Sequence, residues 1–285
     1  MTQMLDDRAH PVEGVLVRVL EHGSLTSRSD HVVGEEPMEV RLGAPGSEPE
    51  PVAVTMRTPG HDFELAVGFL LAEGLLASGA DVLTVRYCDL PEGDLQRYNV
   101  VTVTGTLVPG AAPRRRAATV TAACGVCGTA TLDDLRDRCP PVPEGQRVAP
   151  DLLTSLPDRL RKRQRMFDRT GGLHAAGLFE GTGRLLAVRE DVGRHNAVDK
   201  LVGWAAMQDR LPLSSAVLVV SGRVSFEIVQ KAAVAGIPVV AAVSAPSSLA
   251  VQTAQALGMT LAGFVRDGRA NIYSAPWRLE MAAAS

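Results

Sequence analysis

Cysteines, aromatic residues and long apolar runs are all scarce in this chain of 285 residues. Its four cysteines are too few for the disulfide framework of a small secreted protein, so we expect reduced, available thiols. No apolar run approaches the ~20 residues of a membrane-spanning helix, and the polar N-terminus lacks the apolar stretch of a secretion signal. These absences predict a cytoplasmic protein without a membrane partner.

The charges of the chain nearly balance, with a formal net charge of -3. Such a charge gives no global attraction to nucleic acid, and aromatic residues that would stack on bases make up only 4%. We therefore expect no nucleic-acid partner. One local segment is basic and contains Arg159, Arg161, Lys162, Arg163 and Arg165. It is most simply a solvated helix face; its alternative role is to dock an anionic cofactor or an acidic partner.

Sequence patterns divide the chain into three regions. Residues 12–110 mix alternating strand patterns with one helix, which predicts a smaller α+β N-terminal region. Residues 111–170 are rich in proline, glycine and charge, a composition typical of a functional loop region. Residues 171–280 alternate continuous apolar strands with helices. This last pattern predicts a larger α/β domain with a parallel or mixed sheet between helices.

Several individual elements can be predicted from apolar periodicity and from glycine or proline breaks. In the first region we expect a helix over 62–77 and a hairpin of two strands, 82–87 and 99–104. In the middle region we expect a basic helix over 157–168. In the last region we expect a hairpin around 180–183, strands 215–220 and 238–243, helices 196–207, 224–235 and 247–257, and a final pair of strands, 260–265 and 270–274.

Two cysteines stand two residues apart, at Cys124 and Cys127, and a glycine follows each. The thiolate is the reactive form of cysteine, and glycine leaves backbone N–H groups free to stabilise it. A closed zinc site needs further ligands, and Cys88, Cys139 and His174 form no second pair of this spacing, so we predict no metal site. The residues alone leave open a thioredoxin-like dithiol and a persulfide carrier.

Polar residues gather where the predicted strands end, which is where α/β sheets bind ligands. Arg194 and His195 lie in a polar cluster over 189–196, where we favour a ligand site; the simpler alternative is that the cluster caps the next helix, with Asn196 as the N-cap residue. Ser221, Gly222 and Arg223 follow an apolar strand and are predicted to open a helix, a geometry that binds phosphate through backbone N–H groups. Ser244 follows the next strand, and Arg266 and Arg269 flank a later turn. These positions predict a phosphate-bearing ligand.

Six motifs resemble the formate dehydrogenase accessory sulfurtransferase family, FdhD. The resemblance runs from about residue 15 to residue 278, and the motifs are jointly very specific. They are CGVCG at 124–128, TGGLHAA at 170–176, REDVGRHNAVDK at 189–200, SFEIVQK at 225–231, SAPSSLAV at 244–251 and GFVRDGR at 263–269.

The resemblance implies a cytoplasmic sulfur carrier that forms a homodimer, with a cytidine-deaminase-like larger domain and a smaller domain. By this resemblance, a cysteine desulfurase would pass persulfide sulfur to Cys124, with Cys127 as its relay or helper. The carrier transfers the sulfur to the molybdenum or tungsten of a bis(molybdopterin guanine dinucleotide) cofactor before this cofactor enters formate dehydrogenase. The cofactor is thus a bound substrate, and no permanent cofactor is implied.

The resemblance places the cofactor-binding segment at Phe264, Val265, Arg266, Asp267, Gly268 and Arg269. To these we add the strand-end residues Ser221, Gly222, Arg223, Ser244, Arg194 and His195. We also include His174, although its small and apolar neighbours are typical of a core histidine. The alternative function is a chaperone that binds and delivers the cofactor without itself transferring sulfur.

Overall fold

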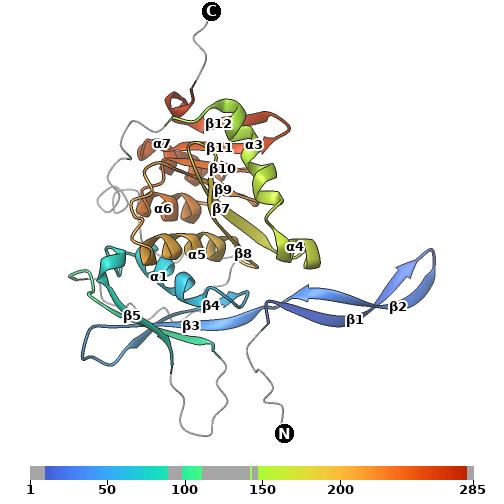
Figure 1. Ribbon diagram of the computed structural model, residues 1–285, viewed down its shortest axis with the longest axis horizontal. Helices are drawn as coiled ribbons and strands as arrows, with labels where there is room; N and C mark the ends of the chain where they lie inside the picture. The colour runs from blue at the N-terminus through green and yellow to red at the C-terminus, as the bar shows by residue number, and fades with distance from the viewer. Residues whose placement is uncertain (1–9, 89–97, 111–141, 143–146, 281–285) are drawn as a thin grey trace, which may run out of the picture.

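The computed structural model describes residues 10–88, 98–110, 142 and 147–280 (Figure 1). A six-stranded sheet forms its larger part, with the strand order β12-β11-β10-β9-β7-β8. The central strands β9, β10 and β11 are parallel, and the other neighbours are antiparallel. The strands are β7 (His174–Glu180), β8 (Leu185–Asp191), β9 (Ala216–Val220), β10 (Val239–Ala242), β11 (Thr260–Arg266) and β12 (Arg269–Ser274).

Helices cover both faces of this sheet (Figure 1). On one face lie α5 (Arg194–Met207), α6 (Phe226–Val234) and α7 (Ser248–Ala256), and on the other lies α3 (Pro150–Arg161). Successive residues of a strand point to opposite faces. Accordingly, Leu218 of β9 is buried on the side of α5, α6 and α7, whereas its neighbours Val217 and Val219 are buried on the side of α3. A strand buried on both faces must be apolar throughout, which explains the continuous apolar run.

A second sheet has four strands in the order β4-β3-β6-β5. They are β3 (Glu36–Gly43), β4 (Glu50–Arg57), β5 (Val82–Tyr87), which follows the short helix η1 (Gly79–Asp81), and β6 (Val100–Gly105). Helix α1 (Asp62–Ala72) lies between this sheet and α5 (Figure 1). One apolar core runs from the four-stranded sheet through α1 and α5 to the larger sheet.

Helices α1 and α5 approach each other closely because each carries a glycine at the crossing. A Cβ atom on Gly68 would lie 1.9 Å from the carbonyl oxygen of Asp199, and one on Gly203 would lie 1.8 Å from that of Glu64. Glycine alone permits such an approach of two backbones. The two glycines therefore set how closely the four-stranded sheet and its helix pack on the larger sheet.

Strands β1 (Val12–Glu21) and β2 (Ser24–Val33) form a two-stranded ribbon that extends away from both sheets (Figure 1). We call this ribbon the arm. A short helix, α4 (Arg165–Thr170), packs against β2 at its base. At the other end of the chain the short helix η2 (Pro276–Arg278) follows β12.

The mixed α/β architecture predicted from the sequence is confirmed, and so are the hairpin of β5 and β6, the β7–β8 hairpin and the strands and helices of the last region. The helix predicted over 62–77 is shorter and ends at Ala72. The helix predicted over 157–168 is wrong as one element. Helix α3 begins earlier, at Pro150, and ends at Arg161, and α4 begins at Arg165.

The domain boundaries at 110 and 170 and the cytidine-deaminase-like character of the larger domain stay predictions. In the described part of the chain, no helix is both long enough and apolar enough to cross a membrane.

Candidate functional site

The start of β7 and the ends of β8 and β9 bring predicted site residues to one edge of the larger sheet. Because β7 is antiparallel to β9, the start of β7 at His174 lies beside the end of β9 at Val220. Ser221 follows β9 directly, and its Oγ accepts a hydrogen bond of 2.9 Å from the backbone N–H of Ala175. A Cβ atom on Gly222 would lie 3.1 Å from Nδ1 of His174 and 3.9 Å from Cδ of Arg194. The side chains of His174 and Arg194 therefore both lie next to Gly222.

Arg194 is the first residue of α5, after the N-cap residue Gly193. Its Nε atom is buried and has no hydrogen-bond acceptor among the residues that the structure describes. A buried guanidinium N–H without an acceptor costs free energy. An anionic ligand oxygen would satisfy it, and the positive end of α5 would add to the attraction.

Two histidines beside Arg194 are electrically neutral at neutral pH. Burial, together with the charges of Lys231 and Arg194, lowers the pKa of His195 to about 3. Burial and the Arg194 charge also lower the pKa of His174. The positive charge of the site therefore comes from its arginines, and the imidazoles offer neutral N–H donors and nitrogen acceptors.

His195 is held by the start of α6. Its Nε2 lies 2.8 Å from Oγ of Ser225 and 3.6 Å from Oε2 of Glu227. Sequence reasoning did not assign Ser225 or Glu227 to the site. The available signal was their position in the SFEIVQK motif at 225–231.

Ser221, Gly222 and Arg223 lie in a loop and do not open a helix, so that part of the prediction is wrong. Helix α6 begins only at Phe226, with Ser225 as its N-cap residue. Residues after β9 pair instead with the loop after β10, through a parallel bridge between Val224 and Pro246. The exposed Arg223 thus stands on a loop that two strand ends support.

Ser244 and Phe264 continue the same edge. The backbone N–H of Phe264 donates to the carbonyl oxygen of Ser244 over 3.2 Å. A Cβ atom on Gly263 would lie 2.9 Å from Cδ of Pro246, so only glycine fits between these loops. Phe264 is 37% exposed and has a positive φ of 54°, which turns its side chain out of the regular strand pattern.

The remaining residues of the predicted segment 264–269 lie farther along the β11–β12 hairpin. Val265 is fully buried in the core on the side of α3. Asp267 and Gly268 both have positive φ and form the two-residue turn between the paired Arg266 and Arg269. Both arginines are exposed. The cofactor-binding roles of these residues stay predictions.

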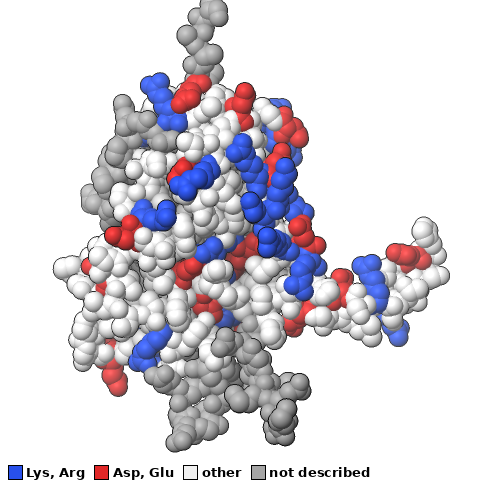
Figure 2. Space-filling model, viewed as in Figure 1, with Lys and Arg blue, Asp and Glu red and all other residues white. Residues whose placement is uncertain are grey.

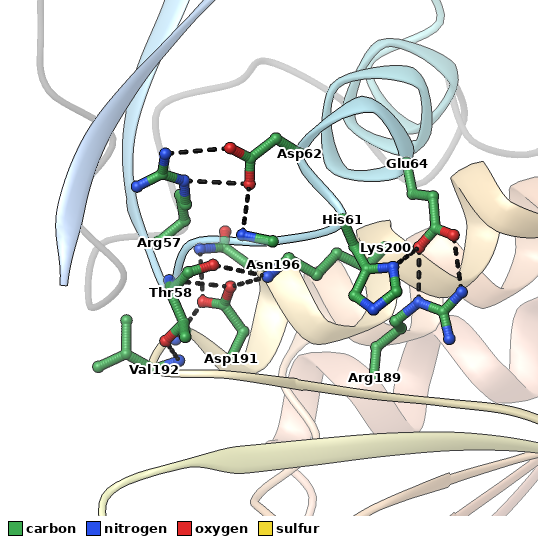
Figure 3. Close-up of polar contacts among 12 residues, drawn as sticks. Arg57, Thr58, His61, Asp62, Glu64, Arg189, Asp191, Val192, Asn196 and Lys200 are labelled. Carbon is green, nitrogen blue, oxygen red and sulfur yellow. Dashed lines mark hydrogen bonds and ion pairs between the residues drawn. The ribbon is translucent and has the colours of Figure 1, made fainter. Parts of the chain in front are cut away.

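Much of the polar cluster over 189–196 joins the two sheets rather than facing a ligand. Four buried residues form what we call the Asp191 network: Thr58, Asp191, Asn196 and Lys200 (Figure 3). Oδ2 of Asp191 accepts from Nζ of Lys200 over 2.6 Å and from the backbone N–H of Thr58 over 3.1 Å. Nζ of Lys200 also donates to the carbonyl oxygen of Thr58 over 2.9 Å. The network ties the segment after β4 to the end of β8 and to α5.

Asn196 does not cap α5, so the capping alternative for this cluster is wrong. It lies in the first turn of the helix, and its Nδ2 donates to the carbonyl oxygen of Met56 over 2.7 Å and to Oδ1 of Asp191 over 2.9 Å. The N-cap position belongs to Gly193, whose backbone N–H donates to Asp191 over 2.8 Å. Asn196 is thus held both by Asp191, five residues earlier, and by Met56, which is more than a hundred residues away in the chain.

Two more residues of the cluster also have structural partners. Nε and Nη2 of Arg189 donate to the carboxylate of Glu64 on α1, over 2.5 and 2.6 Å (Figure 3). The carboxylate of Glu190 accepts from the backbone N–H groups of Met166 and Phe167, at the start of α4. This leaves Arg194 and His195 as the members of the cluster that face the candidate site.

The cysteines Cys124 and Cys127 lie outside the described residues, and so does Cys139. Cys88 is described and is half-buried. Among the residues that the structure describes, no group of three or more His, Cys, Asp or Glu side chains is arranged to hold a metal ion.

Comparisons with known proteins assign the chain to a family. The model of the FdhD/NarQ family matches residues 33–280. The sulfur carrier protein FdhD of Streptomyces avermitilis is 50% identical over 277 residues, which cover 93% of this chain and 95% of that protein. The protein of the same name from Mycobacterium tuberculosis is 51% identical over 268 residues, 90% of this chain and 95% of that protein.

The fold matches a crystal structure from Desulfotalea psychrophila, of a protein described as a formate dehydrogenase accessory protein. The TM-score is 0.73 at 24% identity, over 94% of this chain and 99% of that one. The chain belongs to the FdhD/NarQ family.

Proposed function

We propose that this protein is a cytoplasmic sulfur carrier that adds sulfur to the bis(molybdopterin guanine dinucleotide) cofactor before the cofactor enters formate dehydrogenase. The relatives named sulfur carrier protein support the sulfur-transfer role. In this chain, the observation that carries the proposal is Arg194, whose buried Nε lacks an acceptor among the described residues and stands at the edge where three strand ends meet. We further expect a homodimer.

The sulfur would move in two balanced steps. In the first, the thiolate of Cys124 attacks the terminal sulfur of a persulfide on a cysteine desulfurase; the donor sulfur–sulfur bond breaks, and the donor leaves as a thiolate. In the second, the terminal sulfur must leave Cys124 as sulfide for the metal, which requires two electrons. Cys127 supplies them by attacking the sulfur of Cys124, so that a disulfide forms, and a cellular thiol reductant then restores both thiols.

The residues of the candidate site fit a ligand with pyrophosphate groups, which supports the proposal. Arg194 and Arg223 provide positive charge, and the loops after β9 and β10 lie side by side. Arginine binds phosphate oxygens through charge-assisted hydrogen bonds, which are the stronger kind. The imidazoles of His174 and His195 are neutral, so they can hydrogen-bond to the ligand without the cost of removing a further charge from water.

Mass spectrometry tests the sulfur-transfer step. The protein is incubated with a cysteine desulfurase and cysteine, and its peptides are mapped. We expect one extra sulfur atom on Cys124, lost in Cys124→Ala and kept in the control Cys88→Ala. Wild-type protein that carries no extra sulfur on either Cys124 or Cys127 would contradict the proposal.

An experiment in cells distinguishes sulfur transfer from the alternative in which the protein only delivers the cofactor. The double variant Cys124→Ala with Cys127→Ala removes both thiols and changes no residue of the candidate site. We expect the activity of formate dehydrogenase to be lost. Retained maturation of the enzyme would favour a chaperone that delivers the cofactor without transferring sulfur.

A further inference from the structure

The arm exposes apolar side chains that nothing in the described chain covers. Leu16 is 77% exposed, Leu20 69% and Leu25 60%. Leu20 and Leu25 are directly opposite each other across the ribbon, and Leu16 lies on the same face. A two-stranded ribbon is at most marginally stable on its own in water, and grouped exposed apolar residues mark interaction surfaces.

In the part of the chain that the structure describes, no third strand pairs with the edges of the arm. They pair over ten successive residue pairs without a bulge, and the segment 12–33 contains neither proline nor lysine. Proteins commonly use bulges, proline or lysine to prevent strand edges from pairing with other chains. The arm uses none of these three, and no third strand of the described residues pairs with it, so its outward backbone N–H and C=O groups suit pairing with a strand of another protein.

A basic surface adjoins the arm. Figure 2 shows Lys and Arg side chains gathered over α3 and α4. Arg161 is paired with Asp168 at 2.6 Å, but in the described part of the chain no carboxylate lies within ion-pair distance of four exposed neighbours: Lys162, Arg163, Arg165 and Arg169. Like charges crowded on one face repel each other, and an acidic surface would relieve this repulsion.

The arm and the basic helices form one surface next to the candidate cofactor site. Helix α4 packs against β2, and a Cβ atom on Gly172 would lie 3.2 Å from Cγ1 of Val33 at the base of the arm. Two residues after Gly172 comes His174 of the candidate site. We call the exposed faces of the arm and of the α3–α4 segment the docking surface.

We propose that the docking surface receives an acidic protein that offers an apolar strand edge, and that this protein is the one that takes the cofactor from the neighbouring site. This inference rests on the proposed function, because it assigns the partner by its nearness to the cofactor site. Formate dehydrogenase without its cofactor is then the protein that docks.

Other ligand classes fit the docking surface less well. A lipid bilayer supplies no hydrogen bonds to strand edges, and the arm ends in the polar residues 21–24 (Glu-His-Gly-Ser) rather than in apolar ones. Nucleic acid would be attracted by the arginines but leaves Leu16, Leu20 and Leu25 without an apolar partner. A second copy of this chain would use the leucines, but it does not account for the nearness of the basic helices to the cofactor site.

The test is a binding measurement between the full-length protein and purified, cofactor-free formate dehydrogenase from the same cell. We expect binding that weakens as salt is raised, because the docking surface is charged. The arm variant Leu20→Ser with Leu25→Ser, and the charge-reversal variant Lys162→Glu with Arg163→Glu, should each raise Kd by about tenfold or more. The matched controls are Leu83→Ser and Arg41→Glu, on the four-stranded sheet, which should bind as the wild type does.

Each variant is also tested for GDP binding and for sulfur loading of Cys124. Unchanged values would show that the variant is folded and that the proposed function stands independently of the docking surface. Failure of the wild-type protein in these two assays would overturn the proposed function instead.

Three results would overturn the docking inference. The first is wild-type protein that does not bind the enzyme, or variants that bind it as well as the wild type does. The second is an arm variant that converts a homodimer into a monomer while its affinity for the enzyme stays unchanged. The third is arm-dependent binding to phosphatidylglycerol vesicles or to RNA in place of the enzyme.

Discussion

Nζ of Lys200 lies 2.6 Å from Oδ2 of Asp191, and both side chains are withdrawn from solvent, with relative exposures of 1% and 0%. The pair joins α5 to the end of β8, and both partners also bind Thr58 of the segment after β4. A buried ion pair contributes little net stability when intact, but removing one partner leaves the other charge buried and uncompensated.

We therefore expect Lys200→Met to lower the free energy of unfolding by about 3–5 kcal/mol, measured by urea denaturation. The control is Arg161→Gln, which breaks the exposed pair with Asp168 and should cost less than about 1 kcal/mol. Equal effects of the two substitutions would contradict a structural role for the Asp191 network.

The crossing of α1 and α5 predicts a strong dependence on glycine. Gly203→Ala would place a Cβ atom 1.8 Å from the carbonyl oxygen of Glu64, so the helices must move apart. We expect a loss of at least about 1–3 kcal/mol, the usual cost of overpacking, measured as a lower midpoint of urea denaturation. Gly14→Ala in the arm is the matched control, since nothing lies within 4 Å of its Cβ position.

His195 should make the protein sensitive to acid. Its pKa in the folded protein is about 3, below the ordinary value of 6.5, so between these pH values the unfolded chain binds a proton that the folded protein does not. The contribution of His195 to stability is therefore fully present above pH 6.5 and is lost as the pH falls toward 3.

The variant His195→Gln removes this titration and keeps a side chain that can hydrogen-bond to Ser225. We expect its free energy of unfolding to fall less steeply than that of the wild type as the pH is lowered below 6.5. Some acid dependence will remain, because His174 also has a lowered pKa. Parallel curves for wild type and variant would refute the assignment; His31→Gln, at an exposed position, is the control.

Arg194 should control the affinity for a guanine nucleotide. Replacing it by Gln removes the charge and the buried Nε donor, which has no acceptor in the described part of the chain. A hydrogen bond to a charged group contributes about 1.5–3 kcal/mol, so we expect Kd for GDP to rise about tenfold or more, measured by isothermal titration calorimetry.

The comparison for this experiment is Arg184→Gln. Arg184 lies just before β8, at the opposite end of that strand from the site, and pairs with Glu180 at the surface. The substitution Arg184→Gln should leave Kd for GDP unchanged. If Arg194→Gln binds GDP as tightly as the wild type does, the site lies elsewhere.

Local patterns were enough to predict most elements of the larger sheet. The apolar run of β9 and the glycines Gly236 and Gly258 after the helices are signals contained in a few neighbouring residues. Ser247 caps α7, with its Oγ accepting from the backbone N–H of Ala250, and serine before a helix is a local signal of this kind. The second strand of the arm was not predicted, because the segment 24–33 is mostly polar and exposed and shows no apolar alternation.

The roles of the polar residues over 189–196 could not be predicted from such local patterns. Each of Arg189, Asp191 and Asn196 is satisfied by a partner more than a hundred positions away, such as Glu64, Thr58 or Met56. In the sequence, a cluster of charges near a strand end therefore has the same pattern in two cases: when it binds a ligand, and when it binds another part of the chain.

The sequence by itself determined the family, the mixed α/β class and the order of most strands and helices, because these depend on motifs and on periodicity within short segments. Only the tertiary structure decided which polar groups are satisfied by internal contacts and which, like Arg194, keep a donor without an acceptor among the residues that the structure describes. Hydrogen bonds are saturable and act over about 3 Å. A residue's freedom to bind a ligand therefore depends on neighbours that the fold brings together, and the chain order does not reveal them.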